Sequence, residues 1–545
     1  MFIKILTMKR LIPIILVSLT ACQSNIDKAL KSVSNDDLAK DIATISADSM
    51  LGRAPFTIGE ERAVAYLEKR MAELGLEPVF ENSYIQNVPM VSIISKVPDV
   101  INLSISNNPF ELKANDDYCA WSPTTSPSIK INKADLIFAG FGINAPEYDW
   151  NDFNGIDVKG KIIVVLVNDP GFYTGDTALF KGNTMTYYGR WRYKFEEAER
   201  QGAIGCLIVH EDAPAGYPWD VAGSKNNTPQ LYLDTPDLEN KQCLVNGWIT
   251  HNAAINLFKS CGLDYEASKR QATQRDFQSF SMSAMLSMNI ENSHTKSVSK
   301  NVAGIIKGSE KPDEVIVYSA HWDHLGVGRV VNGDSIYNGA SDNAAAIAWM
   351  FSIAKAFKST GVAPKRSVLF FSPTAEESGL YGSAYFVANP PININKTIAC
   401  INNDVILFLG KFKDVTVTGL GHSSLDELLA EEATKFGRYI APDPNPENGM
   451  FFRSDQLPFL KAGVPSIFAK GYSHQEELGK GKTQELINSY WKNIYHKPQD
   501  EFVPERDNLD GLAEDVKLFF CFGNRLANED IYPTWKKNSE FYKEK

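Results

Sequence analysis

The amino-acid sequence predicts an α/β protein in which a mostly parallel mixed sheet, with helices on both faces, is interrupted by a smaller α/β domain. From Val302 onward, short apolar strands alternate with amphipathic helices, the pattern of a parallel sheet with crossover helices. Between about 130 and 250, three more apolar strands and a helix form a second run of this kind. A chain of 545 residues is also too long for one core, so at least two domains are expected.

The first half of the chain contributes two helices and several strands. Charged residues interleave with apolar ones in residues 59–74, which predicts a helix, and residues 34–50 form an earlier helix. Residues 80–125 are only weakly strand-like. In the insert we predict strands at 134–140, 160–167 and 203–209, and a helix at 193–202. The strict alternation of Phe280–Ile290 predicts a half-buried edge or linker strand.

The second half carries the main alternation. Predicted strands are 315–318, 367–371 and 397–401, and predicted helices are 343–357 and 381–387. We therefore divide the chain into an export signal (1–21), a linker (22–35), a first part of the main domain (36–129), an insert domain (130–250), a return segment (251–299), the main domain (300–530) and a tail (531–545).

Composition and charge restrict the class of protein. The chain is 43% hydrophobic and 22% charged, which is ordinary for a globular protein and argues against disorder. Its 55 basic and 66 acidic residues give a net charge of −11. Because nucleic-acid phosphates would be repelled by this charge, a nucleic-acid partner is not expected.

The N-terminus has the pattern of an export signal. Met8-Lys9-Arg10 is basic, and the apolar run that follows, 11–20, is too short to span a bilayer. Leu19-Thr20-Ala21-Cys22 resembles a bacterial lipobox, which implies that Cys22 is lipidated and attaches the protein to a membrane. Gln23 after the cysteine favours the outer membrane, or the periplasmic face, of a Gram-negative cell. The alternative is an ordinary signal peptide with a cysteine nearby.

The other six cysteines show no metal-binding spacing. Without a CxxC pattern, a cysteine–zinc site is not expected. In an exported protein one disulfide is possible, and Cys243–Cys261 is the closest pair in sequence. Buried free thiols are the other interpretation.

Polar residues able to bind metal follow the predicted strands. His321 comes after the first strand, Glu376-Glu377 after the second and Asp404 after the third, while Asp342 opens a helix and His496 lies far downstream. Each alone has an ordinary explanation; Asp342, for example, would commonly be a helix N-cap. Ligands collect at the carboxyl ends of parallel strands, and imidazole with carboxylate suits zinc. Their joint occurrence therefore predicts a metal centre.

The segment from Asn301 to Glu501 resembles the co-catalytic zinc exopeptidases of metallopeptidase family twenty-eight. The matching strings are His321-Trp322-Asp323, Asn338-Gly339-Ala340-Ser341-Asp342-Asn343, Glu376-Glu377-Ser378-Gly379-Leu380-Tyr381-Gly382-Ser383, Asn402-Asn403-Asp404 and His496. Leu51-Gly52-Arg53 resembles the opening of the same domain. Gly140-Phe141-Gly142-Ile143, Asp157-Val158-Lys159-Gly160-Lys161 and Gly202-Ala203 give the insert a resemblance to a protease-associated domain.

This resemblance implies a role for each residue. Two zinc ions would be bridged by Asp342; His321 and Asp404 would complete one site, and Glu377 and His496 the other. Asp323 would orient His321 by accepting its second N–H. Glu376 would be the general base in the hydrolysis of peptide substrates.

Further positions follow from the same resemblance. The peptide bond after Asp342 is expected to be cis. Tyr381, Phe459 and Tyr495 are candidates for lining the substrate pocket. Ser454-Asp455-Gln456 departs from a pocket motif whose third residue is usually histidine. Ser341 replaces an aspartate found in many relatives but is not a ligand, and His324 is not assigned to the metal.

An aminopeptidase is the preferred activity, and three alternatives stay open. Arg453, near the pocket motif, would suit a carboxypeptidase that binds a terminal carboxylate. A single-zinc cyclase has the same fold, and a surface binding protein without metal is the non-enzymatic alternative. The absence of GxSxG and HExxH disfavours a serine hydrolase and a gluzincin.

Overall fold

The computed structural model describes residues 25–105 and 108–542, so the predicted lipidation site Cys22 lies outside the described residues. The chain forms two compact units. The first contains the residues up to Val88, Ser299–Pro444 and the chain from Ser454 onward; the second contains Pro89–Val298 and Asn445–Arg453. The predicted insert, 130–250, lies within the second unit. In the described part of the chain, no helix is both long and apolar enough to cross a bilayer.

The first unit is built on a mixed sheet. Its strands lie in the order β1 (Glu77–Pro78), β13 (Phe280–Ile306, which belongs to this unit from Ser299 onward), β17 (Arg366–Ser372), β14 (Lys311–Ser319), β18 (Thr397–Asn402), β21 (Ser466–Lys470), β19 (Asp414–Thr418) and β20 (Tyr439–Pro442). The four central strands, from β17 to β21, are parallel, while β13 and β19 are antiparallel to their inner neighbours. The predicted strands and their parallel pairing are confirmed.

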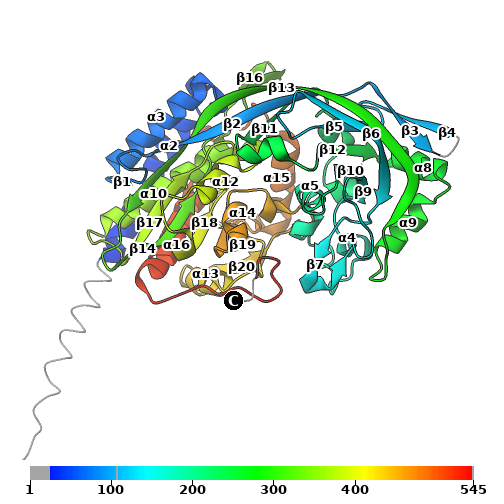
Figure 1. Ribbon diagram of the computed structural model, residues 1–545. Helices are drawn as coiled ribbons and strands as arrows, with labels where there is room; N and C mark the ends of the chain where they lie inside the picture. The colour runs from blue at the N-terminus through cyan, green and yellow to red at the C-terminus, as the bar shows by residue number, and fades with distance from the viewer. Residues whose placement is uncertain (1–24, 106–107, 543–545) are drawn as a thin grey trace, which may run out of the picture. The chain divides into compact units, whose positions relative to one another are not determined.

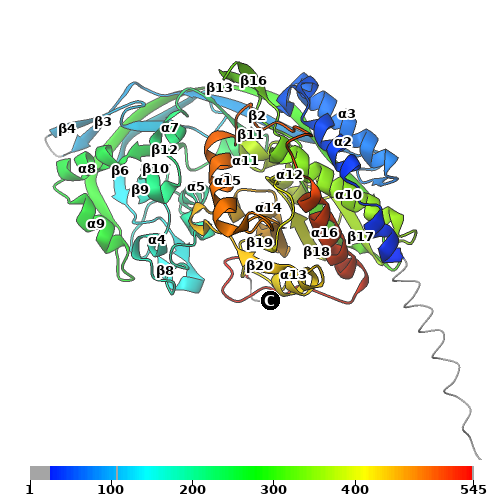
Figure 2. The ribbon, with the colours of Figure 1, turned by 180° about the vertical axis from the view of Figure 1, so that it is seen from behind.

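Helices cover both faces of this sheet. On one face lie α2 (Asn35–Ile45), α3 (Ile58–Glu73), α10 (Ala345–Ser359), α13 (Leu425–Lys435) and α16 (Asp510–Asn528), and on the other α12 (Tyr381–Ala388) and α14 (Gln456–Lys461) (Figures 1 and 2). Along β14, Ile316 and Tyr318 point into the first core and Val315 and Val317 into the second, as alternation in a strand requires. The predicted fold class is confirmed.

Helix α10 shows why the sheet is buried on the first face. Its sequence is rich in alanine, the strongest helix former, and nearly all of its residues are buried. A helix that is apolar on all sides belongs in the interior of a large domain. Trp349 in α10 packs against Tyr318 of the sheet and Phe519 of α16, so the helix is enclosed between the two.

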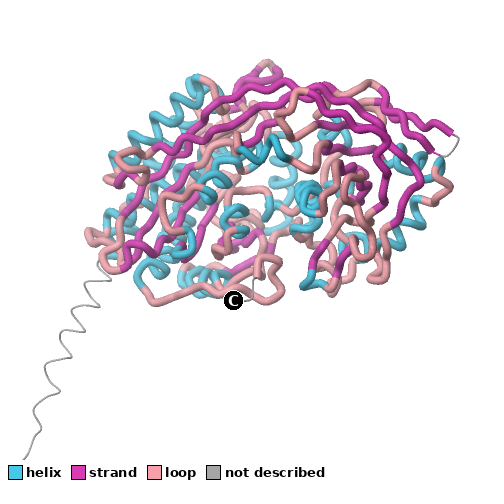
Figure 3. The backbone as a smooth tube through the Cα atoms, in the orientation of Figure 1, coloured by secondary structure: helices cyan, strands magenta, loops and turns pink. Residues whose placement is uncertain are grey.

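Strand β13 corrects one prediction. Residues 280–290 were expected to form an edge or linker strand, but Met285 and Leu286 pair with β3 (Val100–Ile105) on one side and β6 (Ser128–Phe138) on the other. The strand then continues without a break to Ile306 (Figure 3). Alternation of apolar and polar residues shows only that one face of the strand is exposed. An interior strand of an antiparallel sheet has the same pattern, so the alternation did not distinguish it from an edge strand.

The second unit has its own sheet and core. Strand β9 (Ile162–Leu166) is parallel to β6 and to β10 (Gly205–His210), β10 is parallel to β12 (Val245–Thr250), and β12 is antiparallel to β5 (Tyr118–Trp121). Helix α5 (Trp191–Arg200) contributes Phe195 and Ala198 to the apolar cluster around Trp248. The predicted strands of the insert and its amphipathic helix are therefore present.

The six cysteines outside the N-terminal segment are free thiols, so the possible disulfide is absent. Cys243 is buried, and its thiol lies 3.4 Å from Asn246 Oδ1. Cys261 follows helix α8 (His251–Ser260) and is half-buried. Closeness in sequence did not bring the two side chains together.

Candidate metal centre

The carboxyl ends of three of the four central strands bring predicted ligands to one edge of the sheet. His321 lies two residues after β14, Asp404 lies two residues after β18, and Glu376 and Glu377 begin the short helix α11 (Glu376–Gly379) after β17. Asp342 enters from the loop that precedes α10. Because parallel strands end together, residues separated by up to 83 positions meet here.

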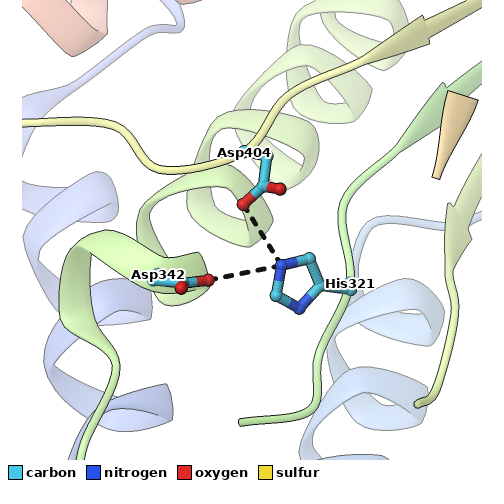
Figure 4. Close-up of side chains that lie close together, drawn as sticks. All are labelled: His321, Asp342 and Asp404. Atoms are coloured by element: carbon cyan, nitrogen blue, oxygen red, sulfur yellow. Dashed lines mark hydrogen bonds and ion pairs between the residues drawn. The ribbon is translucent and has the colours of Figure 1, made fainter. Parts of the chain in front are cut away.

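The first group consists of His321, Asp342 and Asp404. The His321 imidazole is 1% exposed. Its Nε2 lies 3.2 Å from Asp404 Oδ1 and 3.3 Å from Asp342 Oδ1 (Figure 4). All three side chains thus converge on one point, as a shared metal ion requires.

The second group shares Asp342 with the first. His496 Nε2 lies 3.3 Å from Asp342 Oδ2 and 3.0 Å from Glu377 Oε2. The two carboxylate oxygens of Asp342 therefore face two different imidazoles. The Tyr495 ring stacks on the His496 ring with a centroid distance of 3.8 Å, which restricts the orientation of this more exposed imidazole.

These distances fit zinc. Two ligand atoms at the usual bond length in a tetrahedral zinc site lie ~3.3 Å from each other. The four imidazole–carboxylate separations in the two groups are 3.2, 3.3, 3.3 and 3.0 Å. The described residues are thus spaced as ligands would be, and Asp342 is the carboxylate that the two groups share.

The loop that carries Asp342 is held by a second aspartate. The backbone N–H groups of Ser341 and Asp342 each donate 3.0 Å hydrogen bonds to the carboxylate of Asp500. The Asp342–Asn343 peptide bond is cis, as the resemblance implied. Asp500 therefore fixes the backbone from which the shared carboxylate of Asp342 extends.

Asp323 does not make the contact that was predicted. Its Oδ1 lies 3.8 Å from His321 Nδ1, too far for a hydrogen bond, and that nitrogen instead donates to the Asp323 main-chain carbonyl at 3.1 Å. The carboxylate accepts the backbone N–H groups of Glu376 and Glu377 at 3.0 and 3.3 Å. Asp323 thus orients His321 through its backbone and the two glutamates through its side chain.

The two adjacent glutamates have opposite electrostatics. Burial raises the pKa of Glu376 well above its ordinary range; the attraction of His321 opposes this, and the Asp404 carboxylate adds to it. Although burial opposes ionisation of Glu377 too, His496 and His324 lower its pKa to about 2. A glutamate that stays ionised is suited to binding a metal ion, and a glutamate with a raised pKa is suited to accepting and donating a proton.

The centre concentrates negative charge in the interior. Buried acids in this region are Asp323, Asp342, Glu376, Asp404, Asp455 and Asp500. Although burial alone would lower the pKa of His496, Glu377 and Asp342 raise it to about 10. Arg53 and Lys470 also bring positive charge to this region. Both donate hydrogen bonds to main-chain carbonyls of the loops that carry the candidate ligands. Since buried carboxylates are costly without counter-charge, this set favours cations between them.

Comparison with known proteins agrees with the geometry. Residues 301–517 match peptidase family M28, and this stretch contains both groups of candidate ligands and Glu376. Residues 301–517 form a peptidase family M28 domain.

The chain aligns with only about a fifth of the length of the curated relatives that it matches in sequence. A probable zinc metalloprotease of Pyricularia oryzae is 34% identical over 109 residues, 19% of this chain and 20% of that protein. Aminopeptidase NAALADL1 of Mus musculus is 30% identical over 135 residues, 24% of this chain and 17% of that protein. Among solved structures, the aminopeptidase from Aneurinibacillus sp. strain AM-1 is 16% identical with a TM-score of 0.49, covering 92% of this chain and 96% of that one.

The predicted pocket residues of the M28 domain lie in different surroundings. Phe459 is fully buried and packs against Phe371 and Phe386 in the second core of the sheet, where it contributes to packing. Tyr381, at the start of α12, is half-buried, and Tyr495 stacks on His496. Gln456 is buried, and its Oε1 accepts a 2.8 Å hydrogen bond from Asn402.

The structure adds residues that motif comparison left without a role. Asp500 anchors the Asp342 loop, and Ser383 donates a 2.6 Å hydrogen bond to Asp455, one residue before Gln456. Arg53 belonged to a matching string, but nothing in its sequence context indicated which groups it bonds. His324 lies 2.7 Å from Glu377, a contact between segments that are 53 residues apart. The only sequence signal for these residues was their position inside or beside a motif.

Proposed function

We propose that this protein is a zinc-dependent exopeptidase that hydrolyses peptide bonds and releases N-terminal residues. The observation that carries the proposal is that the two oxygens of the Asp342 carboxylate face different imidazoles. Oδ1 lies 3.3 Å from His321 Nε2, and Oδ2 lies 3.3 Å from His496 Nε2. One carboxylate with an imidazole on either side is the arrangement expected of a bridged pair of metal ions. The M28 domain and the names of the aligned relatives support the same activity.

Zinc ions held by these ligands would supply Lewis-acid polarisation of the scissile carbonyl and of the attacking water. The protein's part is proton transfer and orientation. Glu376 Oε2 lies 3.9 Å from His321 Nε2, beside the ligands but outside the closer contacts that they share. It would accept the proton of the water as the C–O bond forms and deliver that proton to the leaving nitrogen as the C–N bond breaks.

Asp323 sets the geometry of this step. By accepting the backbone N–H groups of both glutamates, it holds the general base and a ligand on the same turn. The base therefore keeps a fixed place relative to the second ligand group.

The proposal is tested with Glu376→Gln. The glutamine keeps the shape of the side chain but cannot accept the proton, so kcat is expected to fall by about 10²- to 10⁴-fold. Because Glu376 is not a ligand, zinc content should stay at two ions per chain. If the purified wild-type protein binds no zinc and the substitution leaves hydrolysis unchanged, the enzyme proposal fails and a binding protein is the remaining interpretation.

The preference for free N-termini needs a separate experiment. Aminoacyl substrates with a chromogenic leaving group should be hydrolysed, and the same substrates with a blocked amine should not. Cleavage confined to N-blocked peptides with a free carboxylate would identify a carboxypeptidase instead.

For the location of the protein we propose an exported lipoprotein, from the Leu19-Thr20-Ala21-Cys22 string alone. Metabolic labelling with a radioactive fatty acid should label the wild-type chain and not Cys22→Ser. Labelling of both, or of neither, would contradict lipidation at Cys22.

A further inference from the structure

His324 lies beside the second ligand group without being one of the assigned ligands. Its side chain is buried, and Nδ1 lies 2.7 Å from Glu377 Oε1. The ring packs directly on Gly339, where an added Cβ would lie only 2.7 Å from His324 Cγ and Cδ2. The imidazole is therefore fixed in position by the loop that leads to Asp342.

Proximity alone allows two roles for this imidazole. One atom each from His324, Asp342 and Glu377 lie within 4.8 Å of one another, which would permit His324 to bind a metal directly. The separation from Glu377 decides between the roles. Two ligands of one tetrahedral zinc are ~3.3 Å apart, whereas a charge-assisted N–H···O⁻ hydrogen bond measures about 2.7–2.9 Å. The observed 2.7 Å is a hydrogen bond.

The other oxygen of Glu377 is directed elsewhere. Oε2 lies 3.0 Å from His496 Nε2, on the side of the second ligand group. Helix α11 is only four residues long and lies between two residues with positive φ, Ala375 at 52° and Leu380 at 62°. Bonds to Asp323 fix the backbone of this turn, but the orientation of the carboxylate depends on contacts at its tip.

We propose that His324 is a positioning residue, which donates Nδ1–H to Glu377 Oε1 and so leaves Oε2 as the one oxygen available to the second metal ion. The inference rests on the two-metal site of the proposed function. It deepens that proposal by assigning the residue that determines how Glu377 binds. Partners of this kind typically change metal affinity by about 10- to 100-fold when they are removed.

The test compares three variants of the full chain. His324→Leu removes the hydrogen-bond donor and introduces an apolar side chain of similar length. His324→Asn keeps a donor, because the asparagine Nδ2 lies at the same distance along the side chain as the histidine Nδ1. His422→Leu is the control, since His422 is another buried histidine of the same unit and donates or accepts at Ser539 instead.

The measurement is metal binding to chelator-stripped protein. Competition with a chromogenic chelator yields two zinc dissociation constants, and a cobalt titration followed by visible absorption reports the ligands at each site. We expect His324→Leu to weaken one zinc constant by about 10- to 100-fold and to leave the other unchanged. His324→Asn should restore the weakened constant and the wild-type cobalt spectrum, and His422→Leu should match the wild type.

Two results would overturn the inference. Both zinc constants of His324→Leu within twofold of the wild type would show that the contact does not matter for metal binding. A cobalt spectrum changed in His324→Leu and not restored by asparagine would identify His324 as a direct ligand. If His324→Leu does not fold, His324→Gln replaces it, because that amide extends past Oε1 and should also weaken one site. A wild-type protein that binds no zinc would contradict the proposed function itself.

Discussion

The buried guanidinium of Arg53 provides the sharpest single test of how the loops of the candidate metal centre are held. It donates four hydrogen bonds to main-chain carbonyls, those of Ile45, Trp322, Asn338 and Gly339. These carbonyls belong to the end of α2, the segment after β14 and the loop before Asp342. Arg53→Met removes the donors while keeping a flexible apolar chain.

The expected loss of stability is the difference between two effects. Four bonds from a charged donor at about 1.5 kcal/mol each contribute about 6 kcal/mol. Against this, burial lowers the pKa of Arg53 from 12.5 to about 10, although nearby acids such as Asp342 oppose the change. At about 1.4 kcal/mol per factor of ten, this shift corresponds to a net electrostatic cost of about 3 kcal/mol for the buried charge, and the variant does not carry that cost. The net decrease in the free energy of unfolding is therefore about 3 kcal/mol.

The assay combines two measurements: urea unfolding followed by a spectroscopic signal from the first unit, and the affinity for zinc. Arg366→Met is the matched control, because Arg366 is equally buried and donates to the carbonyls of Leu526 and Glu529 and to Glu314. Both variants should be destabilised, but only Arg53→Met should weaken zinc binding. An Arg53→Met protein within about 1 kcal/mol of the wild type, with both zinc constants intact, would refute this reasoning.

Three further predictions concern the metal centre. Asp500→Asn keeps only one carbonyl oxygen for the N–H groups of Ser341 and Asp342, so zinc affinity should fall about tenfold in a chelator competition. In the metal-free protein, carboxylates raise the pKa of His496 to about 10 despite its burial, so zinc must displace a proton. Zinc affinity should therefore rise with pH up to about 10, and calorimetry at pH 7 in buffers of different ionisation enthalpy should detect proton release. Removing zinc with a chelator should lower the melting temperature, since each site held at 100 times its dissociation constant contributes about 2.7 kcal/mol; an unchanged melting temperature would argue against structural coupling of the ions.

The periodicity of apolar residues in the sequence was sufficient to predict the main helices and strands of the M28 domain. The central strands and the helices α10 and α12 were predicted within a few residues, because apolar spacing reports directly which face of an element is buried. The same signal was insufficient for β13, since an exposed face does not reveal how many strands flank it. The extent of the second unit was likewise beyond the sequence, because Asn445–Arg453 joins it from a distant part of the chain.

The sequence by itself predicted which residues meet at the candidate metal centre: His321, Glu376-Glu377 and Asp404 follow parallel strands, and the order of the motifs added Asp342 from a loop and His496 from far downstream. Only the tertiary structure decided what each atom faces. It showed Asp342 divided between two imidazoles, and the Asp323 carboxylate bonded to the glutamate turn rather than to His321. The reason is physical: strand pattern fixes which residues meet, but a hydrogen bond depends on differences of less than 1 Å between side chains from separate loops.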